Sequence, residues 1–273
     1  MVSTATIVTI SITLFICLIL PIIVYIAYGV KSKGKGVWTA WLLGAAGFFV
    51  FQTVIRMPVL SILSLNAGFV RFAEEQYVLY CLVLALTAAL FEVAGRYLVA
   101  RIMVQKLSYE RSLAAGLGHG SIEAMILIGM TYVNNLLYSI MINTGTYDTM
   151  IEQTKAMGVD VSAYLSVKES LVNTAPGVFL LAGYERILTV LFHIALSMVV
   201  CYFVKQKKDL VGVGICVLCH FTVDFVIPLL NGLATGYMGN VLTTTQSYTL
   251  VYVLLTAVAV VSVLVTRRLK KIW

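Results

Sequence analysis

Seven long apolar runs, spread over the whole chain, constrain its fold more than any other feature. A helix rises about 1.5 Å per residue, so about 20 apolar residues cross a bilayer core of about 30 Å. The runs occupy Thr4–Tyr28, Val37–Ile55, Tyr77–Met103, Ser112–Ile140, Pro176–Val204, Leu210–Leu230 and Ser247–Val265. We therefore predict an all-α, polytopic membrane helix bundle with about seven transmembrane helices, located in the cell membrane.

The composition supports a membrane protein and excludes other classes. Hydrophobic residues make up 60% of the chain, charged residues 11%, and the mean hydropathy is +0.97. A soluble globular protein carries about a quarter charged residues, so this chain lacks the polar surface that such a protein needs. The same values exclude a disordered chain, a secreted disulfide scaffold and a nucleic-acid-binding module. The predicted partner is the lipid bilayer, with no nucleic acid.

The charged residues between the runs predict an orientation. The basic residues behind the net charge of +7 gather after the first, third and fifth runs and at the C-terminal end. Because cytoplasmic loops carry such an excess, the N-terminus is predicted to lie outside and the C-terminus in the cytoplasm. The first run lacks a basic n-region and exceeds the apolar core of a signal peptide, so we expect a retained helix.

The connections contain no linker that would divide the chain. The two longer outer connections, Arg56–Gln76 and Asn143–Ala175, are too polar or too interrupted to span, but they have room for short surface helices. There is no internal repeat and no low-complexity segment. Residues 1–273 are therefore predicted to form a single integral membrane domain, with the site core in the helices that span about residues 77–230.

Nine ionisable residues lie inside the apolar runs, where each charge at a helix centre costs about 2.5 to 3.5 kcal/mol. They are Glu92, Arg96, His119, Glu123, Glu185, Arg186, His193, His220 and Asp224. At this cost they must face one another or a water-filled cavity. A structural polar network is one explanation. Nine groups on four helices favour a functional site, which is the default explanation of intramembrane ionisable residues.

The spacing and depth of these residues predict that they meet. Three pairs lie four residues apart and so share a helix face: Glu92 with Arg96, His119 with Glu123, and His220 with Asp224. Four of the groups lie 12 to 14 residues from a basic residue of the predicted cytoplasmic connections: Glu92, Glu123, His193 and His220. At about 1.5 Å per residue this is roughly 18 to 21 Å, which places all four at a common level.

Carboxylates and imidazoles in a low-dielectric cavity suit the activation of water, and two mechanisms are open. In the first, Glu92, with Arg96 as its charge partner and with help from Glu123 or His193, takes a proton from the attacking water. His220, oriented by Asp224, then stabilises the oxyanion. In the second, His193, His220 and a glutamate such as Glu123 bind zinc, and another glutamate is the base. The expected cofactor is therefore either none or zinc.

Two other chemistries have weaker support, and one well-known zinc motif is missing. Ser121 lies between His119 and Glu123 and is a candidate nucleophile, but no Ser/His/Asp order supports it. The helix-borne HExxH zinc signature is absent. The segment CVLCH, which contains Cys216, Cys219 and His220, matches the pattern for covalent haem attachment. Because it lies in the middle of an apolar run, we expect packing cysteines and no haem.

Four segments in chain order, FEVAGRY, GHGSIEA, YERILTVLFH and HFTVD, resemble the YhfC family of intramembrane proteases. That family is similar to the PrsW proteases and to the CAAX-protease and bacteriocin-processing group. The resemblance implies an endopeptidase, either glutamic-type or metal-dependent, that hydrolyses peptide bonds of a membrane-anchored substrate. It implies catalytic roles for Glu92, Arg96, Glu123, His193, His220 and Asp224, and supporting roles for His119, Glu185 and Arg186.

The chain departs from the wider group at one position. The first motif of that group commonly has two adjacent glutamates, whereas Val93 follows Glu92 here. The four-residue step to Arg96 favours Glu92 as the match to the first glutamate.

Two non-peptidase functions would use the same buried residues. A proton-coupled transporter would use them as a relay, and Pro228 and the glycines beside His119 give it some support. No inverted repeat accompanies them, however. A non-catalytic membrane scaffold would keep the polar core for specificity alone.

Overall fold

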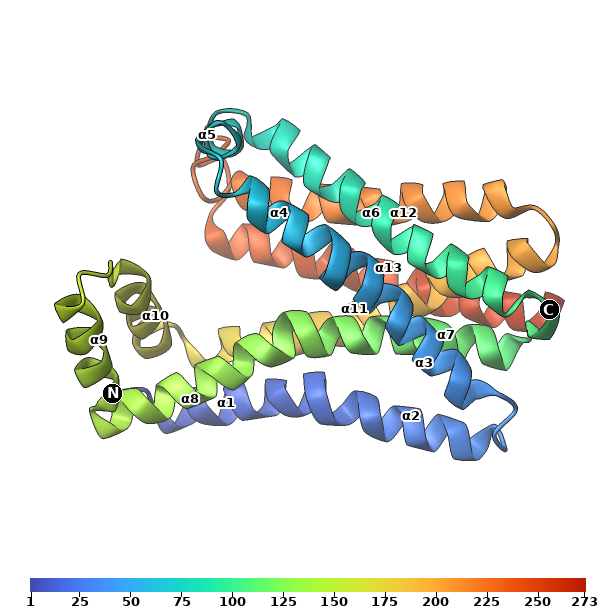
Figure 1. Ribbon diagram of the computed structural model, residues 1–273, viewed down its shortest axis with the longest axis horizontal. Coiled ribbons are helices and arrows are strands. Elements are labelled where there is room, and N and C mark those ends of the chain that lie inside the picture. Colours follow the sequence, from blue (N-terminus) through green and yellow to red (C-terminus); the bar gives the residue numbers. More distant parts are fainter. The chain divides into compact units, whose positions relative to one another are not determined.

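The computed structural model describes all residues from Met1 to Trp273, and every regular element is a helix (Figure 1). The α-helices are α1 (Thr4–Leu14), α2 (Leu20–Lys31), α3 (Val37–Phe48), α4 (Met57–Leu63), α5 (Ala67–Glu75), α6 (Tyr77–Ile102), α7 (Tyr109–Glu123), α8 (Met130–Thr144), α9 (Thr146–Ala156), α10 (Ser162–Asn173), α11 (Pro176–Lys205), α12 (Asp209–Gly232) and α13 (Thr244–Ile272). A short 3₁₀ helix, η3 (Val104–Lys106), follows α6.

Seven helical stretches are long and apolar enough to cross a membrane, which confirms the predicted number and the all-α, multi-pass class. They are Thr4–Lys31, Val37–Leu63, Tyr77–Ile102, Tyr109–Thr144, Pro176–Lys205, Asp209–Gly232 and Thr244–Ile272. The orientation of the termini stays a prediction. Short helices α5, α9 and α10 occupy the two longer connections, as expected.

Three of the seven stretches are interrupted by π-helical segments, in which the backbone gains a residue per turn. These segments are η1 (Phe15–Ile19), η2 (Phe49–Arg56) and η4 (Ala124–Gly129). The last begins directly after Glu123, at the end of α7. Bulges of this kind redirect the side chains that follow them and occur frequently at functional sites.

The structure corrects the position of Arg56, which the sequence analysis assigned to an outer connection. The second stretch continues through η2 and α4 to Leu63, so Arg56 lies within it and is only 8% exposed. Its Nη2 donates to the carbonyl oxygen of Leu84 at 2.8 Å and its Nε donates to Oγ1 of Thr87 at 3.2 Å. A long side chain that bonds to the neighbouring helix α6 allows this charge to enter an apolar stretch.

The chain divides into two compact units. The smaller consists of Met1–Val24 and Ala124–Ile187, and the larger of Tyr25–Glu123 and Leu188–Trp273. The predicted single membrane domain over residues 1–273 stays a prediction.

The smaller unit has its own apolar core and side-chain ties between α1 and α8, which run side by side (Figure 1). Val2 and Asn143 exchange two hydrogen bonds, of 2.7 and 2.9 Å. The carbonyl oxygen of Phe179, at the start of α11, accepts from Oγ1 of Thr13 at 2.7 Å and from the hydroxyl of Tyr132 at 2.8 Å.

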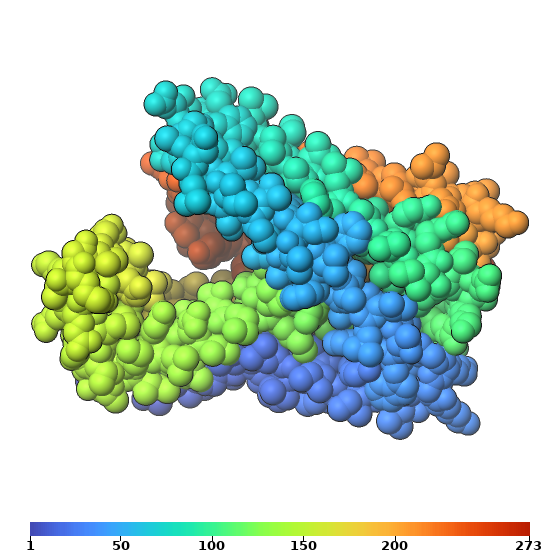
Figure 2. Space-filling view, in the orientation of Figure 1, coloured from blue at the N-terminus to red at the C-terminus, as the bar shows by residue number.

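The larger unit is assembled by close approach of helix backbones at glycines. A Cβ added to Gly44 of α3 would lie 1.9 Å from the carbonyl oxygen of Ala115 in α7, and one added to Gly118 would lie 2.0 Å from that of Trp41. Small residues permit such contacts, which replace the hydrophobic driving force that is absent between helices in lipid. In the space-filling view, the second membrane-crossing stretch forms a diagonal band across this face of the larger unit (Figure 2).

Side-chain hydrogen bonds tie both ends of α6 to α12. The hydroxyl of Tyr77 donates to the carbonyl oxygen of Pro228 at 2.8 Å. At the other end, the hydroxyl of Tyr97 and Nη1 of Arg101 donate to Oδ2 of Asp209 at 3.0 and 3.1 Å. The two helices are therefore antiparallel neighbours, and the middle of α6 faces the middle of α12, where Glu92 and His220 meet.

Candidate active site

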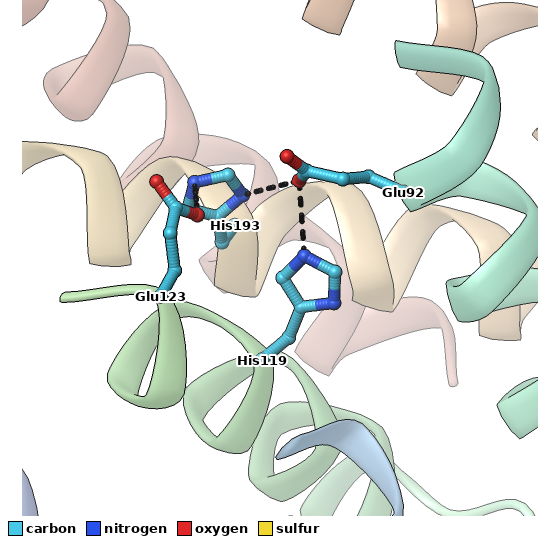
Figure 3. A group of neighbouring side chains, drawn as sticks. All are labelled: Glu92, His119, Glu123 and His193. Carbon is cyan, nitrogen blue, oxygen red and sulfur yellow. Dashed lines mark hydrogen bonds and ion pairs between the residues drawn. The ribbon is translucent and has the colours of Figure 1, made fainter. Parts of the chain in front are cut away.

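Four helices of the larger unit bring two carboxylates and three imidazoles into one buried cluster, which we call the Glu–His cluster. Its members are Glu92 of α6, His119 and Glu123 of α7, His193 of α11 and His220 of α12. None is more than 7% exposed. Figure 3 shows four of them pointing toward one another, with His193 between the two carboxylates. The structure thus brings together the four groups that were predicted to lie at one depth.

A single oxygen of Glu92 is the centre of the cluster. Its Oε2 lies 3.1 Å from Nε2 of His119, 3.1 Å from Nε2 of His220 and 3.2 Å from Nη2 of Arg96. Nδ1 of His193 lies 4.0 Å away. Groups from three other positions of the fold therefore converge on one carboxylate oxygen, together with an arginine from its own helix.

The remaining contacts pair each of two histidines with a second carboxylate. Oε2 of Glu123 lies 2.6 Å from Nε2 of His193. Oδ2 of Asp224, one turn further along α12, lies 3.3 Å from Nδ1 of His220. The Asp224 side chain is 34% exposed, so this end of the network reaches the surface of the protein. Both contacts are within ion-pair distance, and Nδ1 of His220 forms no hydrogen bond with the protein.

The glycine-rich sequence of α7 explains why His119 and Glu123 come so close to α11. A Cβ added to Gly116 would lie 2.6 Å from Cα of Ile194, and one added to Gly120 would lie 3.1 Å from Cα of Val190. These two glycines, four residues apart, form a GxxxG face that lets the two backbones approach. His193 lies between Val190 and Ile194 in the chain, so the same close approach brings it to Glu123.

Arg96 is the cation of the site. It is 3% exposed, and its Nη2 contacts both Glu92 and Nδ1 of His193. Its Nε and Nη1 are buried and form no hydrogen bond with the protein. A small cavity with room for a water molecule lies beside it, lined among others by His119, Ser197 and Cys201. The predicted pairing of Arg96 with Glu92 is confirmed, and the contact with His193 is additional.

Two predicted supporting residues belong to the smaller unit. Glu185 and Arg186 lie in the part of α11 assigned to that unit, where they form an ion pair with each other.

Ser121, the candidate nucleophile, is fully buried, and its Oγ has no hydrogen-bond partner, so no histidine activates it. Cys216 is fully buried and Cys219 is exposed.

The sequence analysis missed Arg56 and gave His119 only a supporting place. Arg56 is a further buried cation, and its hydrogen bonds go to Leu84 and Thr87 of α6, the helix that carries Glu92. The sequence offered one signal for Arg56. It lies four residues after Gln52, a polar residue inside the apolar run, and so continues the same helix face beyond the end of that run. His119 contacts the central oxygen of Glu92 as closely as His220 does.

The donor set of the cluster fits a divalent metal ion. Glu92, His119, Glu123 and His193 are all buried, and each offers a ligand atom within 4.8 Å of the others. Imidazole nitrogen and carboxylate oxygen are ligands of zinc, and atoms 2.0–2.1 Å from a tetrahedral zinc lie about 3.3 Å from one another. The distance of 3.1 Å between Oε2 of Glu92 and Nε2 of His119 is close to this separation. The predicted ligand set of Glu123, His193 and His220 shares two members with this group and stays a prediction.

Known proteins resemble this chain. The model of the YhfC intramembrane metalloprotease family matches residues 16–245. The chain belongs to this family. An uncharacterized membrane protein of Bacillus subtilis (strain 168), YhfC, is 31% identical over 212 residues, which cover 77% of this chain and 80% of that protein. No solved structure matches. The predicted family is thereby confirmed, while the relation to PrsW and the CAAX group stays a prediction.

Proposed function

We propose that this protein is an intramembrane endopeptidase that hydrolyses peptide bonds of membrane-anchored substrates at the Glu–His cluster. The observation that carries the proposal is the convergence of His119, His220 and Arg96 on Oε2 of Glu92, with Glu123 and His193 beside it. Buried ionisable groups are costly in a membrane, and here seven of the nine gather at one site, a set that suits the activation of water. Membership of a metalloprotease family supports the same function.

We assign the holding of a metal ion, such as zinc, to Glu92, His119 and His193. One ligand atom of each of these residues lies within 4.8 Å of the others, so together they can hold one ion. When bound, zinc would acidify a water molecule and polarise the substrate carbonyl.

The second carboxylate, Glu123, takes the proton of the attacking water. It lies at the end of α7, next to the π-helical turn, and its contact with Nε2 of His193 fixes its position in the cluster. A general base must lie within about 2.6–3.2 Å of the proton that it removes, or reach it through one water. Glu123 is a candidate for this role because one of its oxygens lies within 4.8 Å of ligand atoms of Glu92, His119 and His193, a separation that one water can bridge.

His220 stabilises the negative oxygen that forms on the substrate carbonyl. Asp224 lies 3.3 Å from Nδ1 of His220, and Nε2 lies 3.1 Å from Oε2 of Glu92. The ring donates to the forming oxygen from Nε2 as an imidazolium, the form in which both ring nitrogens are donors, and Asp224 balances its charge. In a site from which bulk water is excluded, one oriented donor of this kind contributes more than it does in water. Asp224 is a positioning residue, because it acts through His220.

Two conservative variants distinguish the proposed role of Glu92 in metal binding from the proposed role of Glu123 as general base. Purified Glu123→Gln should keep the metal content of the wild-type protein but lose cleavage of a membrane-anchored peptide in proteoliposomes. Glu92→Gln should lose both. Glu110→Gln is the matched control on α7, because this residue pairs with Lys35 at 3.2 Å in a more exposed position. Cleavage by both Glu92→Gln and Glu123→Gln at the wild-type rate would overturn the proposal.

A further inference from the structure

The guanidinium of Arg96 lies between a carboxylate oxygen of Glu92 and a ring nitrogen of His193. Its Nη2 lies 3.2 Å from Oε2 of Glu92 and also contacts Nδ1 of His193. Glu92 and His193 come from different helices, and the distance between Glu92 Oε2 and His193 Nδ1 is 4.0 Å. One guanidinium nitrogen therefore bridges two atoms that could both be ligands of a metal ion.

The contact with Arg96 determines which nitrogen of His193 carries a lone pair. A guanidinium can only donate hydrogen bonds, so Nδ1 of His193 accepts. A neutral His193 then carries its proton on Nε2, which lies 2.6 Å from Oε2 of Glu123. Metal-binding histidines commonly have one nitrogen facing the ion and a carboxylate beside the other, as Glu123 lies beside Nε2 of His193. Nδ1 of His193 is therefore the atom ready to bind a metal, and Arg96 contacts it.

A metal ion and Nη2 of Arg96 cannot both occupy this position. A zinc ion bound to Glu92 Oε2 and His193 Nδ1 would lie about 2.0–2.1 Å from each. The bridging nitrogen of Arg96 stands between the same two atoms. Two positive charges this close in a low-dielectric site repel each other strongly. Metal binding therefore requires the guanidinium to move.

The structure contains space for that movement. The small cavity beside Arg96 is lined by Gly44, Val99 and Ala115 and by the hydroxyl-bearing Ser197. Oγ of Ser197 is buried without a hydrogen-bond partner, as are Nε and Nη1 of Arg96. The cavity has room for about one water molecule, and a guanidinium that shifts into it moves toward the unpartnered Oγ of Ser197.

We infer that Arg96 and a divalent cation are alternative occupants of the position between Glu92 and His193. The guanidinium lies in this position, and we expect it to withdraw toward Ser197 when the ion binds. The inference rests on the metal-binding role proposed above. It assigns Arg96 a further function, because this guanidinium holds Glu92 and His193 of two different helices together.

Cobalt(II) binding to the purified full-length protein in detergent tests this exchange without reference to peptidase activity. The dissociation constant is measured from cobalt absorption in competition with a chelator. Arg96→Met removes the competing charge and should bind cobalt about tenfold or more tightly than the wild-type protein, within the usual range of coupling between two sites. Arg96→Lys keeps a charge and should remain close to wild type. Arg101→Met, on the same helix but 51% exposed, is the control and should not change the affinity.

A variant that leaves Arg96 in place provides the second measurement. Ser197→Ala removes the hydroxyl that receives the displaced guanidinium, so it should weaken cobalt binding several-fold while the protein stays folded. Equal or weaker cobalt binding by Arg96→Met, or no effect of Ser197→Ala, would overturn the inference and leave the metal site standing. The absence of cobalt binding in every protein would overturn the inference together with the metal site.

Discussion

Oε2 of Glu123 lies 2.6 Å from Nε2 of His193, and this contact joins the end of α7 to the middle of α11. It exists because the glycine face of α7 lets the two backbones come unusually close. The chemistry of the site therefore depends on packing between helices as much as on the reactive groups themselves. The predictions below test the packing, the positioning contacts and the reactive groups separately.

Enlarging Gly118 should destabilise the larger unit. A Cβ at this position would lie 2.0 Å from the carbonyl oxygen of Trp41, a backbone atom that cannot move alone. Overpacking of this kind costs about 1–3 kcal/mol. We expect Gly118→Ala to lower the melting temperature of the purified protein and to reduce cleavage. The matched control is Gly214→Ala in α12, where a Cβ would meet no atom within 4 Å. Equal melting temperatures for the two variants would contradict the packing account.

Removing the guanidinium of Arg56 should lower stability by about 1.5–3 kcal/mol, the range for hydrogen bonds that involve a charged group. Arg56→Met loses the bonds to the carbonyl of Leu84 and to Thr87 that connect η2 to α6. Thermal unfolding in detergent measures the change. Arg71→Met, on the exposed helix α5, is the control and should leave the melting temperature unaltered. If Arg56→Met were as stable as this control, the hydrogen bonds of Arg56 to Leu84 and Thr87 would not contribute to the stability of the protein.

Asp224→Asn should lower kcat and leave KM nearly unchanged. The carboxylate of Asp224 orients His220 without reaching the other members of the cluster, so its loss affects the transition state more than substrate binding. Loss of such a supporting carboxylate typically costs about 10–100-fold. Steady-state kinetics in proteoliposomes provide the test. A rise in KM at constant kcat would show instead that Asp224 binds the substrate.

Glu123→Gln should reduce the cleavage rate by about 10²–10⁴-fold, the usual contribution of a general base. The amide cannot accept a proton, but it keeps the size of the side chain and a hydrogen-bonding group beside His193. Single-turnover cleavage with excess enzyme measures the chemical step directly. A rate within a few-fold of wild type would assign the base to another residue.

The number of membrane-crossing helices could be predicted from the sequence, because it depends on local apolar length. The meeting of the reactive groups could be predicted from their similar spacing from basic residues. Each helix rises by a constant amount, so counting residues from a basic end gives a depth for Glu92, Glu123, His193 and His220 without tertiary information. Family membership could also be recognised, since the four motifs occur in order on successive helices.

The contacts within the cluster could not be predicted, because they depend on how helices approach and rotate. His119 was given a supporting role, yet it touches the same oxygen as His220, since the glycines around it bring α7 close to its neighbours. Arg56 was placed outside the membrane because its charge ends an apolar run. Only the neighbouring helix, which supplies the carbonyl of Leu84 and the hydroxyl of Thr87, shows how that charge is buried.

The most direct test of the proposed function is cleavage of a membrane-anchored peptide in proteoliposomes by wild-type protein and by Glu92→Gln, with matched folding and insertion. Since every contact of the central carboxylate oxygen would be weakened at once, we predict cleavage by the wild-type protein and none detectable by the variant. Cleavage by Glu92→Gln at the wild-type rate would contradict the proposal that this carboxylate is the centre of a hydrolytic site.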